Sequence, residues 1–215
     1  MPTLVLLLAL ATGSDGGAPR ALRYLALGDS FTAGTGSSPD LAFPVQLKRA
    51  LARRGVDVRL ENVAVSGYTT ADVIDEELPA LSHFKPDTVT LAIGANDLVR
   101  VRDPDKYRAN LKTIFAAVRE AGVKPRRIFV LPQPDWSRAP AGRAFGDPRT
   151  LRERIDRYNT VLKEEAALAG ATYVDLFPLF QQQAKEGLVS EDGLHPSPRA
   201  YAAWAEALVE PLLAP

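Results

Sequence analysis

Short apolar runs alternate along this chain with longer segments of helical periodicity, and this alternation leaves few folds open to it. Five of the runs predict strands, at residues 22–27, 56–65, 88–93, 127–131 and 172–174. Strands separated by helices predict right-handed βαβ units, and hence a parallel sheet with helices on its faces. We therefore expect an α/β fold with a five-stranded parallel sheet, whose functional site lies at the carboxyl ends of the strands.

The helical segments carry their own start and stop residues. Two helices are expected over residues 41–54 and 70–83, and Pro79 inside the second predicts a kink or an early end. Three more helices should start where an Asp or Ser N-cap precedes a Pro, at Asp103, Asp147 and Ser197. Together these segments provide the crossover connections that the parallel sheet requires.

Composition removes several classes of function. The 215 residues suit one domain, and their 26 basic and 26 acidic side chains argue against a protein that neutralises nucleic-acid phosphates. The chain has no Cys, so disulfides, thiolate metal sites and a Cys nucleophile are excluded. Its two His residues rule out a multi-histidine metal site.

The N-terminus holds an apolar run of eight residues, LVLLLALA, at positions 4–11. A membrane span needs roughly 20 apolar residues, whereas the apolar part of an export signal needs about 7–15. We therefore expect no transmembrane span, and we predict that residues 1–20 are an export segment of a periplasmic or extracellular protein. A flexible tail on a cytoplasmic protein is the alternative, because no Lys or Arg precedes the run.

Four polar motifs lie after predicted strands or before the last helix. They are GDSFTAG at 28–34, NVAVSG at 62–67, GAND at 94–97 and DGLHP at 192–196. A Ser in a Gly-flanked turn at a helix start can expose its hydroxyl and offer its own N–H to an anion. A Gly N–H and an Asn side chain are donors suited to a developing oxyanion. The sheet geometry predicts that these groups meet.

The same motifs supply the parts of a nucleophilic site. A Ser hydroxyl such as that of Ser30 is a weak nucleophile until an adjacent base takes its proton. His195 is a candidate base, because the unperturbed pKa of His, about 6.5, lies near working pH. Asp192, three residues earlier, can hold the ring of His195 in one tautomer.

In this combination and order, the four motifs resemble those of the GDSL-type esterases and lipases of the SGNH hydrolase family, over roughly residues 22–213. The resemblance implies a flavodoxin-like three-layer α/β/α domain, here over residues 21–215, that needs no metal or cofactor. It implies Ser30 as the nucleophile, with His195 as general base and acid and Asp192 as its orienting partner.

The resemblance also implies an oxyanion hole made by the N–H of Ser30, the N–H of Gly67 and the side-chain amide of Asn96. The expected reaction is hydrolysis of a carboxylic ester through an acyl-enzyme. Asp29 and Asp97, which flank these motif residues, are expected to be structural, since Asp readily binds nearby loop N–H groups.

Four residues are candidates for the substrate pocket: Phe31, Tyr68 and Leu98 follow catalytic positions, and Trp136 lies on a loop rich in Pro, Gly and Arg. We expect short- to medium-chain acyl esters, lysolipids or thioesters as substrates. A carbohydrate O-acetyl esterase is the alternative, and a binding module that has lost the chemistry is a third reading. No nucleic-acid partner is expected, and the sequence does not predict the oligomeric state.

Overall fold

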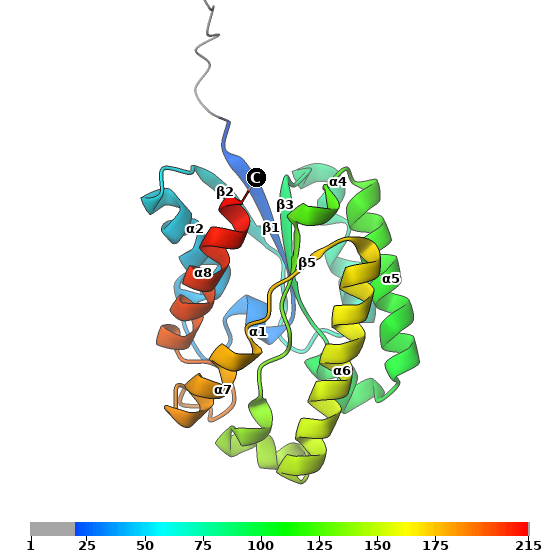
Figure 1. Ribbon diagram of the computed structural model, residues 1–215, viewed down its shortest axis with the longest axis vertical. Coiled ribbons are helices and arrows are strands. Elements are labelled where there is room, and N and C mark those ends of the chain that lie inside the picture. The colour runs from blue at the N-terminus through cyan, green and yellow to red at the C-terminus, as the bar shows by residue number, and fades with distance from the viewer. Residues whose placement is uncertain (1–19, 215) are drawn as a thin grey trace, which may run out of the picture.

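Five strands form one parallel sheet in the computed structural model, which describes residues 20–214 (Figure 1). They are β1 (Leu22–Gly28), β2 (Val58–Asn62), β3 (Thr88–Ala92), β4 (Ile128–Val130) and β5 (Thr172–Tyr173). Their order is β2-β1-β3-β4-β5, the doubly wound arrangement in which the chain reverses direction beside β1. The predicted α/β class and the five-stranded parallel sheet are confirmed, and the switch point lies between β1 and β3.

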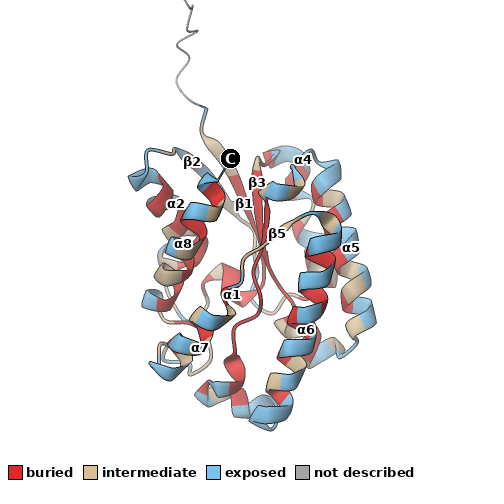
Figure 2. Ribbon diagram, in the orientation of Figure 1, coloured by how far each residue is buried: buried red, intermediate tan, exposed pale blue. Residues whose placement is uncertain are grey.

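Helices cover both faces of the sheet, so the domain has the expected three layers. The long helices α2 (Phe43–Arg53) and α8 (Pro198–Leu213) pack on each other at one face. At the other face, α5 (Pro104–Glu120) packs on α6 (Pro148–Ala169). Figure 2 shows the buried residues concentrated in the strands and on the helix sides that face them, as amphipathic helices on a sheet require.

The three predicted N-caps start their helices. Asp103 and Asp147 each accept hydrogen bonds from the backbone N–H groups two and three residues later, at 3.0–3.1 Å. Ser197 accepts one from the N–H of Ala200 at 3.3 Å. The shorter elements are α1 (Ser30–Ala33), η1 (Pro39–Leu41), η3 (Asp97–Val101), η4 (Pro125–Arg127), η5 (Trp136–Arg138) and η6 (Pro140–Phe145).

The segment predicted as one helix over 70–83 is divided. A first turn, α3 (Thr70–Asp72), continues into a π-helical turn, η2 (Val73–Glu77), and α4 (Ala80–Phe84) begins after Pro79. The interruption at Pro79 is expected, because proline has no backbone N–H to donate inside a helix. In the wider turn, Glu77 faces the core and accepts a hydrogen bond from the N–H of Gly28 at 2.8 Å.

One helix was not predicted. The short α7 (Phe177–Lys185) follows β5 and buries Phe180 and Gln183 against α8. The apolar run at 4–11 lies outside the described residues, so the structure does not bear on the export prediction. None of the helices within residues 20–214 is long and apolar enough to cross a bilayer.

Candidate active site

Ser30 is placed at the switch point by the sharp turn that ends β1. Asp29 caps α1 by accepting a hydrogen bond from the N–H of Phe31 at 3.1 Å, and Ser30 is the first residue of that helix. Gly28 has a φ of +149°, and a Cβ there would lie 2.2 Å from the carbonyl oxygen of Ala92 in β3. Only glycine permits this close approach, which sets Ser30 between the ends of β1 and β3.

Ser30, His195 and Asp192 form a continuous hydrogen-bonded chain. Ser30 Oγ lies 2.9 Å from His195 Nε2, and His195 Nδ1 lies 2.7 Å from Asp192 Oδ2. An ionised carboxylate only accepts hydrogen bonds, so the proton of the neutral ring resides on Nδ1 and leaves Nε2 free to accept the Ser30 proton. The side chain of His195 is 13% exposed, and its ring packs on Phe31 with centroids 5.5 Å apart.

The turn that carries Asp192 and His195 supports both side chains. Asp192 Oδ1 accepts hydrogen bonds from the N–H groups of Leu194 and His195 and from the hydroxyl of Ser190, at 2.7–2.9 Å. Partial burial alone would raise the pKa of Asp192, but these donors and His195 together hold it well below its usual range. The carboxylate therefore stays ionised beside the imidazole at all working pH values.

Three residues that line one pocket at Ser30 offer hydrogen-bond donors: Ser30 itself, Gly67 and Asn96. Neither the N–H of Ser30 nor that of Gly67 donates a hydrogen bond to another residue of the described chain. The amide of Asn96 donates one proton to the carbonyl of Tyr68 at 2.9 Å, which fixes its orientation and leaves its second proton available. Gly67 has a φ of +90° and no atom within 4 Å of where a Cβ would stand, so that side of the residue borders open space.

The loop that carries Gly67 is tied to the turn that carries Asn96. Arg100 donates to the carbonyl of Gly67 at 2.7 Å. Asp97 accepts from the N–H and the hydroxyl of Thr70 at 2.9 and 2.5 Å, which is the structural role expected of it. Sequence reasoning missed Arg100, since no motif marks an arginine that supports a carbonyl.

Two buried carboxyl groups lie directly behind this site. Asp29 and Glu77 are each 1% exposed, and one oxygen of each has no hydrogen-bond partner among the described residues. Burial raises the pKa of Asp29 to about 7 and that of Glu77 to about 8. The charge of Asp97 also raises the pKa of Asp29, and the charge of Asp29 also raises that of Glu77. The role of Asp29 as a cap agrees with the structural expectation, whereas Glu77 was not singled out.

A pocket of about 150 Å³ opens beside these groups. It is bordered by the Ser30–His195 pair, by Gly67 and Asn96, and by apolar side chains that include Phe31, Trp136, Phe145 and Leu194. Phe31 and Trp136 therefore lie where we expected pocket residues. No group of three or more potential metal ligands occurs within the described part of the chain.

Tyr68 and Leu98 do not line this pocket, which corrects our expectation for these two residues. Leu98 is fully buried because the η3 turn directs its side chain into the core rather than toward Ser30. Tyr68 contributes its carbonyl, which orients Asn96, and its ring is not part of the lining.

Comparisons with known proteins agree with this geometry. Residues 26–203 match the GDSL-like lipase/acylhydrolase family. The chain is 28% identical to an arylesterase of Vibrio mimicus over 98% of this chain and 96% of that one. It is 28% identical to the esterase TesA of Pseudomonas aeruginosa over 82% and 81%. A crystal structure of a lipase/acylhydrolase from Enterococcus faecalis superposes with a TM-score of 0.71 at 27% identity, covering 88% of this chain and 94% of that one.

Proposed function

Because this chain belongs to the GDSL-like lipase/acylhydrolase family and is a carboxylic ester hydrolase, we propose that it cleaves short- to medium-chain acyl esters, lysolipids or thioesters through an acyl-enzyme. The observation that carries the proposal is the chain of hydrogen bonds from Ser30 through His195 to Asp192, at 2.9 and 2.7 Å. The free donors beside it supply what a tetrahedral intermediate needs.

In the first step, Ser30 Oγ bonds to the carbonyl carbon of the ester while His195 Nε2 takes the hydroxyl proton. The charge on the former carbonyl oxygen is stabilised by the N–H groups of Ser30 and Gly67 and by the amide of Asn96. When the intermediate collapses, the bond to the alcohol breaks and the alcohol takes the proton from His195. Ser30 then carries the acyl group.

In the second step, water takes the place of the alcohol. His195 removes a proton from the water as its oxygen bonds to the acyl carbon, and the same three donors stabilise the second oxyanion. The bond to Ser30 breaks, Oγ recovers its proton from His195, and the carboxylic acid leaves. Asp192 stabilises the imidazolium formed in each step by its ionised carboxylate 2.7 Å from Nδ1.

Hydrolysis of p-nitrophenyl esters from acetyl to palmitoyl tests this proposal with wild type and Ser30→Ala. We expect the variant to lose all measurable activity. Ser82→Ala is the matched control, because Ser82 is exposed and donates only to the carbonyl of Pro79. Esterase activity that survives Ser30→Ala would refute the assigned nucleophile.

The same assay separates the alternatives. A strict preference for acetyl esters would favour the carbohydrate O-acetyl esterase. A folded protein that neither hydrolyses an ester nor reacts with a fluorophosphonate probe would be a binding module, since such a probe labels an activated serine. A maximum at medium chain length supports the proposal as stated.

Export of the protein also belongs to this proposal. It rests on the apolar run at 4–11, whose length suits an export signal better than a membrane span. N-terminal sequencing of the protein purified from a periplasmic fraction tests it. A mature chain that begins near residue 20 supports export, and an intact N-terminus found in the cytoplasm contradicts it.

A further inference from the structure

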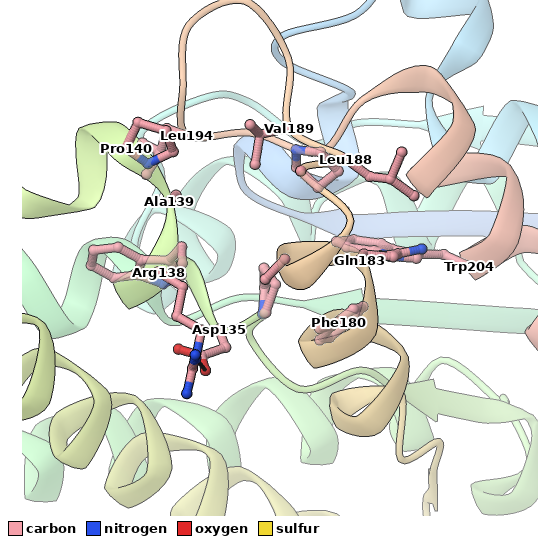
Figure 3. A pocket seen from close by; sticks show the side chains of 15 residues that line it. Asp135, Arg138, Ala139, Pro140, Phe180, Gln183, Leu188, Val189, Leu194 and Trp204 are labelled. Carbon is pink, nitrogen blue, oxygen red and sulfur yellow. Dashed lines mark hydrogen bonds and ion pairs between the residues drawn. The ribbon is translucent and has the colours of Figure 1, made fainter.

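A second cavity lies behind the pocket at Ser30, and the proposed chemistry does not use it. It measures about 190 Å³ and lies between the 134–140 segment, α7, the loop at 187–196 and α8 (Figure 3). Trp136 and Leu194 line both this cavity and the catalytic pocket. The two spaces are therefore adjacent, and these two side chains form the wall between them.

The lining of the cavity is apolar. Phe180, Leu188, Val189 and Leu194 lie around it, as Figure 3 shows. Apart from the indole N–H of Trp136, the polar side chains that reach it have partners within the described chain. Gln183 accepts from the indole N–H of Trp204 at 2.8 Å and donates to the carbonyl of Ala200 at 3.2 Å.

The one acid in the lining is also neutralised. Asp135 is buried and accepts from Arg152 at 2.8 Å and from the hydroxyl of Ser137 at 2.5 Å. Arg138 lies 3.4 Å from the same carboxylate. The cavity thus presents apolar surface without an unpaired charge, which suits an apolar ligand.

The shared wall contains a polar atom without a partner. The indole N–H of Trp136 is buried and donates to no residue of the described chain. The ring is held edge-on by Phe145, with centroids 5.3 Å apart. A buried N–H without an acceptor costs free energy. The indole N–H is therefore suited to donate to an oxygen atom of a ligand or of a water molecule.

We propose that this cavity binds the apolar end of the acyl chain of the substrate, an inference that rests on the esterase function proposed above. A cavity of about 150 Å³ lined by aliphatic and aromatic side chains is large enough for benzene. The cavity seen here, at about 190 Å³, therefore holds several methylene groups. Each buried methylene should raise kcat/KM about fourfold.

The acyl chain fits this position better than the alcohol does. The acyl group stays bound to Ser30 through both steps, so a site next to Ser30 can hold it throughout hydrolysis. The alcohol must leave between the steps. Ser66 lines the catalytic pocket and is exposed, so this pocket meets solvent at that residue.

Substitutions that change the volume of the cavity test the proposal. Ala184, on α7, lines the cavity, and Ala184→Phe fills part of it. We expect the ratio of kcat/KM for p-nitrophenyl octanoate to that for the acetate to fall at least tenfold. Leu188→Ala enlarges the cavity and should move the optimum to longer acyl chains. Ala167→Phe, on the exposed side of α6, is the matched control and should leave the ratio unchanged.

Each outcome decides one point. If wild type hydrolyses esters but Ala184→Phe leaves the chain-length ratio unchanged, the cavity does not bind the acyl chain. If the variant alters discrimination among acetate esters of alcohols of increasing length instead, the cavity binds the alcohol and our assignment is wrong. If wild type hydrolyses no ester, the proposed function itself fails.

Discussion

Replacing Glu77 by Gln should make the free energy of unfolding less dependent on pH between pH 5 and pH 8. Glu77 is 1% exposed, and burial raises its pKa from 4.5 to about 8. In the unfolded chain it ionises near its ordinary pKa, whereas the folded protein keeps it protonated to higher pH. The folded state therefore binds more protons in this window, and its stability falls as pH rises through the folded pKa.

The size of the effect follows from the one proton involved. A difference of one bound proton changes the free energy of unfolding by about 1.4 kcal/mol per pH unit. For a pKa that moves from 4.5 to about 8, this is about 3 to 4 kcal/mol lost between pH 5 and pH 8. Asp29, whose pKa burial raises to about 7, adds a slope of the same sign that Glu77→Gln does not remove.

Glutamine is a suitable replacement, because its carbonyl oxygen can still accept the hydrogen bond that Gly28 donates to Glu77 at 2.8 Å. Urea unfolding at pH 5, 6, 7 and 8 can be followed by the fluorescence of the buried Trp136 and Trp204. The stability of the variant relative to wild type should rise by about 3 to 4 kcal/mol across that range. The same comparison with Glu206→Gln, a surface residue paired with Arg53, should show no such trend. A difference between Glu77→Gln and wild type that is constant with pH would refute the reasoning.

Three further predictions concern the site. Asn96→Ala should lower kcat about 10²–10³-fold with little change in KM, because it removes a proposed oxyanion donor, and steady-state kinetics with an unchanged kcat would contradict this. Arg100→Met should lower kcat about three- to tenfold with an unchanged pH profile, because it frees the carbonyl of Gly67 but leaves the donors in place; an unchanged kcat contradicts it. Gly28→Ala should destabilise the fold by at least about 2 kcal/mol in urea unfolding, since its Cβ would lie 2.2 Å from Ala92; a loss under 0.5 kcal/mol contradicts it.

The strands and helices that form the layers of this fold were predictable, because each is marked by a pattern of residues close together in the sequence. The strands coincide with apolar runs. Three helices begin at an Asp–Pro or Ser–Pro pair, whose Asp or Ser caps the helix in the structure. The gathering of the motifs was predictable for a topological reason. In a doubly wound sheet, Ser30 and Asn96 must meet, because they follow neighbouring parallel strands at the switch point.

What escaped prediction depends on contacts that no local pattern records. Glu77 lies among several acids on a polar segment, and only the π-helical turn decides that it, rather than Glu76, enters the core. Leu98 follows the catalytic motif closely in sequence, yet the η3 turn directs it inward. The cavity behind Trp136 forms where the 134–140 segment, the loop at 187–196 and α8 meet α7, a helix that the sequence pattern did not predict.

The short spacing between Asp192 and His195 should allow the substrate selectivity of the site to change while its hydrogen-bonded residues keep their geometry. Both side chains are oriented inside one turn, which is closed by hydrogen bonds between Ser190 and His195 and between Ser197 and Leu188. The ring of His195 takes its orientation from Asp192 within this turn, and the turn is joined to α7 through the hydrogen bond that the N–H of Leu188 donates to the carbonyl of Gln183. The helix α7 and the 134–140 segment form much of the cavity wall, so substitutions there should alter acyl selectivity while the geometry of the hydrogen bond between His195 and Ser30 is retained. A structure of Ala184→Phe in which that hydrogen bond is broken would show that the two parts of the site are coupled after all.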